Sequence, residues 1–292
     1  MRVTMKDVAR RSGVSPATVS FVLNEVSGQT IPAATRERVR RAAEELGYVP
    51  HGIARALREG TSRLVVLNVG RLPRRTSLSG FIDGLDAELA RLGHSLLVHY
   101  GDSVGRVASA ASPRAILDLA GLYAGEDPDA HDGGWIAGLA AHTLTQIAYL
   151  ASRGHVALAF AVPSDPRVAR LASLRWEQAR TAAAAYGLPE PVLVRDVSAL
   201  ADHPTVTALA AFDDDVALRV LAGMRDLGLA APADLAVIGF DDNEIAALWS
   251  PALTTVRVDA VAYGRCAARH ALGMDPGPLP AEPAVVVERA TC

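Results

Sequence analysis

The sequence predicts an α-helical helix-turn-helix domain at the amino terminus, followed by a larger α/β domain. Three observations support this prediction: the net charge changes sign near residue 60, two short helical patterns flank a glycine turn, and apolar strand patterns alternate with helical ones from residue 64 onward. The 292 residues are enough for two or three domains with buried cores. With 50% hydrophobic and 21% charged residues, the composition argues against both a disordered chain and a membrane protein.

The charge of the chain is unevenly distributed. Residues 1–60 carry ten basic and six acidic side chains, a net charge of +4, whereas the other 232 residues carry 19 basic and 26 acidic ones, a net charge of −7. A basic segment before an acidic remainder indicates one segment that binds a polyanion and a separate domain with another function. The alternative is a chance cluster of charges on a solvated helix face.

Other features narrow the location and the chemistry. No apolar run approaches the roughly 18 residues of a spanning helix, and the first residues lack the apolar region of a secretory signal. We therefore expect a cytoplasmic protein with no membrane partner. Cys266 and Cys292 are too few for a disulfide framework and are not spaced for a metal site, so we expect no metal and no cofactor.

The first predicted helix follows a capping pattern. Thr4 and Asp7 have the spacing of a capping box, in which each residue's side chain bonds to the backbone of the other. A helix over residues 5–11 therefore begins after Thr4. The Ser-Gly pair that ends at Gly13 terminates it.

The second predicted helix begins with Ser15 as its N-cap and Pro16 at its first helical position, and it covers residues 16–23. The residues expected to face inward are Val19, Val22 and Leu23, and those expected to face outward are Ala17, Thr18, Ser20 and Phe21. Two short helices around a glycine-containing turn form a helix-turn-helix.

A third helix is predicted over residues 33–46, with Gly47 as its stop. Its expected core stripe consists of Val39, Ala43 and Leu46, and its basic residues are Arg36, Arg38, Arg40 and Arg41. The segment that follows, bounded by Pro50 and Gly60, could form a helix of two turns. Such a helix would be marginal alone, because helices under about 12 residues rarely persist without packing partners.

The remainder of the chain alternates between strand and helix patterns. Predicted strands cover residues 64–69, 95–99, 120–123, 156–162, 191–194, 206–212 and 235–240. Predicted helices cover residues 81–92, 137–153, 174–186 and 215–227. Apolar strands that alternate with helices indicate parallel sheets covered on both faces, and such sheets bind ligands beyond the carboxyl ends of their strands.

Four ordered blocks of the sequence resemble the head and hinge of the LacI/GalR family of bacterial transcription regulators. The blocks are residues 6–24, 35–39, 43–50 and 53–57. The resemblance implies a helix-turn-helix headpiece at residues 1–49, a hinge helix at 50–60, and an effector-binding and dimerisation domain at 61–292. That last domain would have two α/β subdomains, like type I periplasmic sugar-binding proteins.

In this family the second helix enters the major groove of DNA. The resemblance places Pro16, Ala17, Thr18, Ser20 and Phe21 in the groove, and Thr4, Ser15, Asn24 and Tyr48 on phosphates. The side chains of Pro16, Ala17 and Phe21 cannot make bidentate hydrogen bonds to a base. Direct readout should therefore depend on methyl contacts and on Ser20.

The hinge of the family folds on its operator, where two copies meet in the minor groove. The matching residues are Ala54, Arg55, Leu57 and Arg58. Leu57 corresponds to the Leu that partly unstacks the central base step, and the two arginines would lie near phosphates. The alternative for Leu57 is an ordinary apolar contact of a linker helix.

Two further blocks, residues 237–243 and 250–256, resemble the effector domain of the family. They make Arg175, at the expected start of a helix, and Asp241 the main effector-binding candidates. Asp213 joins them, because it stands where many relatives have Asn. These charges would suit a polar ligand such as a sugar, and the alternative is an internal ion pair between Arg175 and Asp241.

The chain departs from the family on one side of the expected cleft. Relatives often place an aromatic pair where Ser77 and Leu78 stand, in a loop that also carries Arg71, Arg74 and Arg75. Residues 124–136 are about one strand-helix unit short, so the first subdomain should be shortened. These departures leave open an unusual ligand or a regulator that needs none.

A cluster formed by residues 213–215 with residues 241–242 resembles a metal or hydrolase site, since hard cations prefer several carboxylates. We favour instead a structural role, with Asp215 starting a helix and Asp214 capping it. We therefore expect no catalytic residues.

The sequence as a whole predicts a repressor that binds a pseudopalindromic double-stranded DNA operator as a homodimer, with further pairing to a tetramer left open. We expect it at the nucleoid when it is bound to DNA, and we expect a small polar effector to control it. One alternative is a ligand-independent regulator of the same family. Another is a solute-binding protein or a carbohydrate enzyme, against which the head and the missing signal segment both argue.

Overall fold

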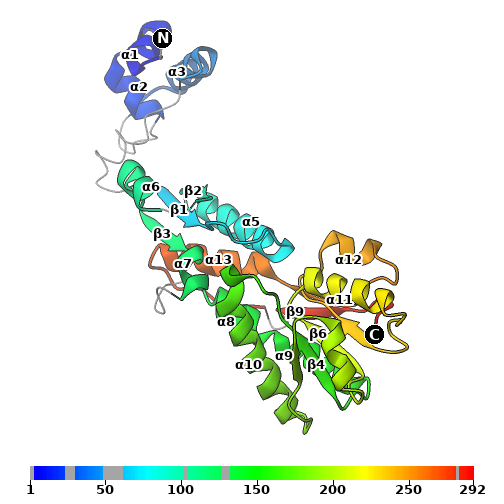
Figure 1. Cartoon of the computed structure of the whole chain (residues 1–292). Coiled ribbons are helices and arrows are strands. Elements are labelled where there is room, and N and C mark those ends of the chain that lie inside the picture. The colour runs from blue at the N-terminus through cyan, green and yellow to red at the C-terminus, as the bar shows by residue number, and fades with distance from the viewer. Residues whose placement is uncertain (1–2, 24–29, 49–61, 102–103, 126–131, 281–282) are drawn as a thin grey trace. The chain divides into compact units, whose positions relative to one another are not determined.

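The computed structural model describes six stretches of the chain, which are residues 3–23, 30–48, 62–101, 104–125, 132–280 and 283–292. The chain divides into two compact units (Figure 1). We call residues 1–63 the head and residues 64–292 the body, and each unit is described by itself.

The head is built from three helices, α1 (Met5–Ser12), α2 (Pro16–Leu23) and α3 (Ala33–Leu46), and all three predicted helices are thereby confirmed. Its core contains Val8, Val19, Val22 and Val39, each no more than 1% exposed. Gly13 and Gly47 adopt left-handed backbone conformations, with φ of 68° and 62°, and end α1 and α3 as expected.

Both predicted caps of the helix-turn-helix are present. The carboxylate of Asp7 accepts hydrogen bonds from the Thr4 backbone N–H at 2.9 Å and from the Thr4 hydroxyl at 2.6 Å. These bonds hold the pKa of Asp7 below its usual value. At the start of α2, the Ser15 hydroxyl oxygen accepts from the Thr18 backbone N–H at 3.1 Å.

The first half of the body has a parallel sheet in the order β2-β1-β3. Its strands are β1 (Leu64–Asn68), β2 (Ser95–His99) and β3 (Ala115–Asp118), and its helices are α5 (Thr76–Arg91), α6 (Val104–Ala111) and α7 (Leu119–Ala124). The strand predicted over residues 120–123 is wrong. The side chain of Asp118 accepts from the Gly121 N–H at 3.0 Å, so the chain turns into α7 directly after β3.

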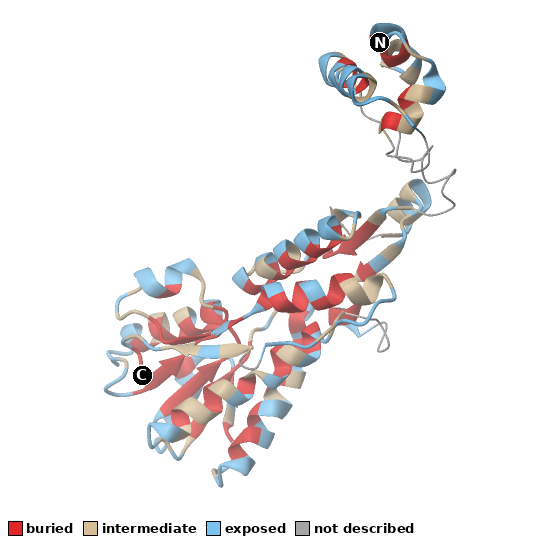
Figure 2. Cartoon of the chain, turned by 180° about the vertical axis from the view of Figure 1, so that it is seen from behind, coloured by how far each residue is buried: buried red, intermediate tan, exposed pale blue. Residues whose placement is uncertain are grey.

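The second half of the body has a parallel sheet in the order β5-β4-β6-β7. Its strands are β4 (Leu158–Ala161), β5 (Val192–Val194), β6 (Ala208–Ala211) and β7 (Ala236–Ile238). Every residue of β4, β6 and β7 is buried, which agrees with their continuous apolar sequence. Figure 2 colours the body by burial, with buried segments in red. An antiparallel pair, β8 (Thr255–Val258) and β9 (Ala284–Val287), was not predicted.

Several helices accompany this second half. They are α8 (Trp135–Ala141), α9 (Thr143–Ser152), α10 (Ala169–Ala185), α11 (Asp214–Asp226) and α12 (Glu244–Leu248), with short 3-10 turns at η1 (Pro166–Val168) and η2 (Val197–Asp202). The single helix predicted over residues 137–153 is wrong. It is divided between α8 and α9 at His142, whose Nε2 is hydrogen-bonded to the Tyr263 hydroxyl at 2.8 Å.

Two helices begin earlier than predicted. Helix α5 starts at Thr76, which places Ser77 and Leu78 in its first turn and not in a loop. Helix α10 starts at Ala169, so Arg175 lies inside the helix and not at its start. In both helices the first turn already contributes a buried apolar residue, Leu78 in α5 and Leu171 in α10.

A late helix, α13 (Ala260–Ala271), packs beside α5 of the first half (Figure 1). Glycines make this close contact possible. A Cβ atom at Gly264 would lie 2.1 Å from the Phe81 carbonyl oxygen, and one at Gly84 would lie 2.1 Å from the Val261 carbonyl oxygen. The carboxyl-terminal part of the chain therefore returns to complete the first half of the body.

The first half of the body is small. In the part of the chain that the structure describes, its sheet has three strands and the second sheet has four. After α7 the chain proceeds to α8 and α9 and then to β4 of the second sheet. The shortage of one strand-helix unit expected near residues 124–136 stays a prediction, because part of that stretch lies outside the described residues. Among the described residues, none of the helices is long and apolar enough to cross a membrane.

Candidate nucleic-acid interface and cleft site

Helix α2 presents the residues expected in the major groove. Val19 and Val22 anchor the helix in the core of the head, at 0% and 1% exposure. Of the expected groove residues, Pro16 and Ala17 are exposed, and Thr18, Ser20 and Phe21 are half-buried. The start of α2 and its outer face are thus the parts of the helix open to a partner.

Some charged residues of the head hold its helices together. The Arg38 side chain donates from Nε to the Ser12 carbonyl oxygen at 2.9 Å, at the carboxyl end of α1, where a cation also interacts favourably with the helix dipole. Arg11 pairs with Glu45 of α3 at 2.6 Å. These contacts fix α1 against α3 and do not involve residues of α2.

The remaining expected DNA contacts are distributed as follows. Thr4 and Ser15 are exposed, and Tyr48 is half-buried against the core of the head. Asn24, Ala54, Arg55, Leu57 and Arg58 lie outside the described residues, so their expected roles stay predictions.

The three effector candidates lie around one pocket of the body. It is enclosed by the loop before α5, by α10 and by the ends of β6 and β7, and its volume is about 30 Å³. Arg175, Asp213 and Asp241 all line it, together with Arg75. The sequence therefore identified residues that the fold brings together, although the space left between them is only enough for one or two waters.

Arg175 is 2% exposed and makes its hydrogen bonds inside the protein. It donates to Thr143 Oγ1 at 2.9 Å, to Gln146 Oε1 at 2.6 Å and to the carbonyl oxygen of Phe212. Its guanidinium carbon lies 3.7 Å from the centre of the Phe240 ring. Burial, together with the nearby charge of Arg75, lowers the pKa of Arg175 to about 9.

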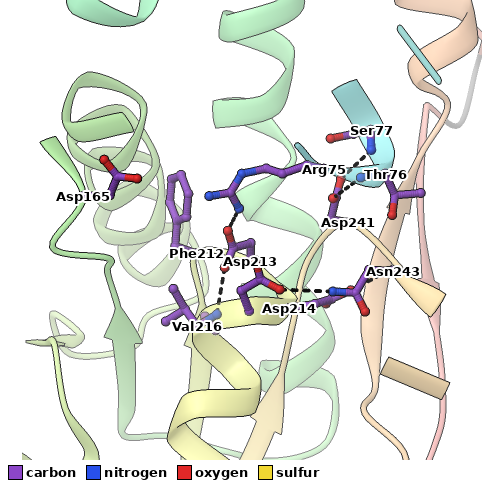
Figure 3. A network of polar contacts seen from close by, with 12 residues as sticks. Arg75, Thr76, Ser77, Asp165, Phe212, Asp213, Asp214, Val216, Asp241 and Asn243 are labelled. Atoms are coloured by element: carbon purple, nitrogen blue, oxygen red, sulfur yellow. Dashed lines mark hydrogen bonds and ion pairs between the residues drawn. The ribbon is translucent and has the colours of Figure 1, made fainter. Parts of the chain in front are cut away.

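Asp241 binds the start of a helix of the first half. Its two carboxylate oxygens accept from the backbone N–H groups of Thr76 at 2.8 Å and Ser77 at 2.9 Å (Figure 3). The amino-terminal end of α5 favours negative charge at this place. Burial raises the pKa of Asp241, and the hydrogen bonds from Ser77 act against that shift. Among the described residues no ion pair joins Asp241 to Arg175, so that expected alternative is wrong.

Asp213 has two structural partners. Oδ1 accepts from the Val216 N–H at 2.8 Å and caps α11, and Oδ2 is ion-paired with Arg75 (Figure 3). The expected caps at this helix are therefore wrong by one residue, because Asp213 caps it and Asp214 begins it. The Arg75 guanidinium carbon also lies 5.2 Å from the centre of the Phe212 ring.

Asp214 is a structural residue rather than a metal ligand. It is 1% exposed, accepts from the Thr255 hydroxyl at 2.5 Å and accepts from the Asn243 backbone N–H at 2.7 Å. Burial raises its pKa to about 7. The described residues contain no group of three or more side chains arranged to hold a metal ion.

The sequence analysis did not identify Arg75 as a pocket residue and placed it only in a loop. The sequence does contain a signal for the opposite wall of the pocket, because the dipeptide Phe-Asp occurs twice, at residues 212–213 and 240–241. The first copy directly follows β6, the second follows β7 after Gly239, and these two strands are neighbours in the sheet. Parallel neighbours end at the same edge, so the repeat places two aromatic rings and two carboxylates together.

A second, larger hollow of about 320 Å³ lies at the carboxyl ends of β1 and β3. Asn68 and Asp118 form part of its wall, with the Asn68 amide donating to Asp118 Oδ1 at 2.8 Å. Arg167 at its rim is held by Asp165 and donates to the Arg71 carbonyl oxygen. The walls of this hollow are thus largely hydrogen-bonded to one another.

Comparison with known proteins assigns both parts of the chain. Residues 4–51 match the family model of bacterial regulatory proteins, lacI family, and residues 147–292 match that of a periplasmic binding protein-like domain. The chain belongs to the LacI family. It is therefore a DNA-binding transcriptional regulator and not an enzyme, and the solute-binding and carbohydrate-enzyme alternatives are excluded.

Curated relatives of this LacI-family chain are repressors. The HTH-type transcriptional repressor PurR of Vibrio vulnificus (strain CMCP6) is 28% identical over 296 residues, which cover 87% of this chain and 86% of the relative. PurR of Aliivibrio fischeri (strain ATCC 700601 / ES114) is 25% identical over 311 residues, which cover 90% of this chain and 89% of that protein.

Solved structures show the same fold. The Lac repressor dimer bound to operator and the anti-inducer ONPF has a TM-score of 0.73 at 22% identity and covers 100% of this chain and 99% of its own. The complex of the regulator CelR with cellobiose has a TM-score of 0.58 at 23% identity, with complete coverage of both chains. These likenesses confirm a helix-turn-helix head joined to a two-part periplasmic-binding-protein-like body.

Proposed function

We propose that this LacI-family regulator is a repressor that binds a pseudopalindromic operator as a homodimer. The observation that carries the proposal is the exposed start of α2, which Ser15 caps and which the core of the head holds in place through Val19 and Val22. The likeness to a repressor dimer solved on its operator supports the same arrangement. A symmetric dimer would set two such helices into successive major grooves.

A binding selection tests this function. The purified chain is mixed with fragmented genomic DNA at a stated salt concentration, and retained fragments are sequenced. A single enriched palindrome, bound by one dimer in a band shift, is the expected result. Retention without any enriched palindrome would contradict the proposal.

Substitutions in the head test whether α2 recognises the bases of the enriched site. Ser20→Ala removes the hydroxyl expected at a base edge, and we expect about tenfold weaker binding of the enriched site with little change for unrelated DNA. Arg40→Ala, on α3, serves as the control, because loss of a cation weakens all DNA alike. Equal losses on both DNAs for Ser20→Ala would contradict base readout by α2.

We propose that a small polar molecule controls operator binding from the pocket formed by Arg175, Asp213 and Asp241. The CelR relative was solved with cellobiose, and the Lac repressor with ONPF, which supports a small-molecule site at the cleft. A ligand that binds one arrangement of the two halves better than the other shifts the population bound to DNA. A sugar was the sequence-based expectation for this ligand.

One observation favours a second candidate, a regulator that needs no ligand. Arg75 occupies the pocket and Asp241 is bound to the start of α5, so side chains of the protein itself join both halves. A thermal-shift panel of sugars, nucleosides, amines and organic acids separates the two candidates. A ligand that raises the melting temperature and changes operator binding supports control, and a panel without response supports the ligand-free candidate.

Assembly and location follow from the same proposal. We propose a dimer that acts in the cytoplasm and associates with the nucleoid when it is bound to DNA, since that is where an operator lies. Light scattering of the chain with and without operator DNA distinguishes a dimer from a tetramer. A monomeric complex with a whole palindrome would contradict the dimer.

A further inference from the structure

The pocket around Arg75 has the composition of a cation-binding site. Its aromatic side chains are Tyr123, Trp135, Phe212 and Phe240, and its carboxylates are Asp213 and Asp241. Aromatic faces attract cations because the ring quadrupole is negative above the plane. Carboxylates beside them add charge-assisted hydrogen bonds. This combination is typical of sites that hold ammonium and guanidinium groups.

The protein fills this site with one of its own side chains. The side chain of Arg75 is 19% exposed, its guanidinium lies over the Phe212 ring, and it is ion-paired with Asp213 (Figure 3). Arg75 belongs to the first half of the body, just before α5, whereas Phe212 and Asp213 follow β6 in the second half. The occupant and its site therefore come from different halves.

Charge balance restricts what can replace Arg75. The side chain of Asp213 is 5% exposed, and Arg75 is its ion-pair partner among the described residues. Among the described residues Arg175 forms no ion pair with Asp213, and the three hydrogen bonds of its guanidinium go to Thr143, Gln146 and the Phe212 carbonyl group. A neutral or anionic ligand that displaced Arg75 would leave the buried carboxylate of Asp213 without its ion-pair partner, which is strongly unfavourable.

We propose that the ligand of this pocket is an organic cation, whose guanidinium or alkylammonium group replaces that of Arg75 between Phe212 and Asp213. The inference rests on the proposed control by a small molecule and names the chemical class of that molecule. Exchange would break the ion pair that joins the two halves while the charge of the pocket stays balanced. Arg75 thus acts as an intramolecular competitor of the ligand.

Chemical rescue of Arg75→Ala in the full-length chain tests this assignment. The variant opens the pocket and leaves Asp213 unpaired. We expect ethylguanidinium or propylammonium chloride at millimolar concentration to raise its melting temperature by about 3 to 5 °C at ten times the dissociation constant, relative to sodium chloride at equal ionic strength. Wild-type protein should shift less at the same concentration, because the cation must first displace Arg75.

Matched variants show whether the response comes from the pocket. Arg74→Ala removes the same charge one residue away, from a guanidinium that lies over the exposed Tyr100 ring, and it should respond like wild type. Adding Asp213→Asn to Arg75→Ala removes the buried charge, and that double variant should lose the response. If Arg75→Ala alone does not fold, the cation should restore its folding, whereas the double variant should fold without it.

Any one of several results would overturn the assignment. They are stabilisation of Arg75→Ala by glucose or sodium acetate as strongly as by the cations, no response of a folded Arg75→Ala, an equal response of the double variant, and a wild-type shift as large as that of Arg75→Ala. A failure to rescue an unfolded Arg75→Ala, while the double variant folds, would do the same. Operator selection by wild-type protein is measured in a separate experiment. A negative result for the cation site therefore does not affect the test of DNA binding.

Discussion

The guanidinium of Arg75 and the carboxylate of Asp213 form an ion pair that joins the two halves of the body. Both side chains are largely shielded from water, so solvent screening of the pair is weak. Asp241 adds a second connection through the backbone of Thr76 and Ser77. The two halves are therefore held together by contacts between side chains and backbone groups of the chain itself.

The hydrogen bonds of Arg175 lead to a first prediction. Arg175→Met keeps much of the side-chain volume but leaves three buried acceptors, on Thr143, Gln146 and Phe212, without their donor. We expect the free energy of unfolding to fall by about 3 kcal/mol. Urea denaturation measures this change.

Arg219→Met on the exposed face of α11 is the control for this substitution, and it should change stability by less than about 0.5 kcal/mol. Equal effects of the two variants would show that the internal bonds of Arg175 contribute nothing specific.

The contact between α5 and α13 leads to a second prediction. Gly264→Ala places a Cβ atom 2.1 Å from the Phe81 carbonyl oxygen, so the helices must separate, and we expect a loss of about 3 kcal/mol. Gly80→Ala is the matched control in α5, where the new Cβ would meet the Ala260 side chain at 3.3 Å. Its effect should stay within about 1 kcal/mol of zero. A tolerated Gly264→Ala would contradict this packing.

The buried carboxyl group of Asp214 leads to a prediction about pH. Burial raises its pKa from 3.8 to about 7, so between these values the folded protein binds a proton that the unfolded chain has released. Stability should therefore decrease as pH rises from about 4 to about 7, by at most about 1.4 kcal/mol per pH unit from this group.

The comparison with Asp214→Asn isolates this contribution. Asn does not titrate, so the stability of wild type relative to the variant should fall over that pH range. Parallel pH profiles of the two proteins, measured by urea denaturation, would show that Asp214 is charged in the folded protein.

A fourth prediction concerns the hinge and rests on the family resemblance. Leu57→Ala should weaken binding to the selected operator by about tenfold or more, because the apolar wedge at the central base step is lost. Binding to unrelated DNA should change little. Band shifts with both DNAs at one salt concentration measure the two affinities, and an equal loss on each would contradict the wedge.

Local sequence signals predicted the head well and the body less evenly. The caps at Thr4 and Ser15 and the stops at Gly13 and Gly47 are short-range features, and they set the three helices of the head within a residue. In the body the strand at residues 120–123 was misplaced because apolar residues lie on both sides of Asp118, in β3 and in α7. A run of that kind does not show where a strand ends, and the capping bond from Asp118 decides it.

The sequence by itself determined the family, the regulatory class and the three effector candidates, because helix caps, apolar periodicity and short motifs are encoded by neighbouring residues. Only the tertiary structure decided that Arg175 bonds inward, that Asp241 caps α5, and that Arg75 fills the pocket beside Asp213. These partners are separated by long stretches of chain, and their pairing depends on how two sheets and the loops at their edges come together. Local sequence patterns do not predict which distant residues will pair. The charge balance of the pocket therefore follows only from the folded arrangement of both halves.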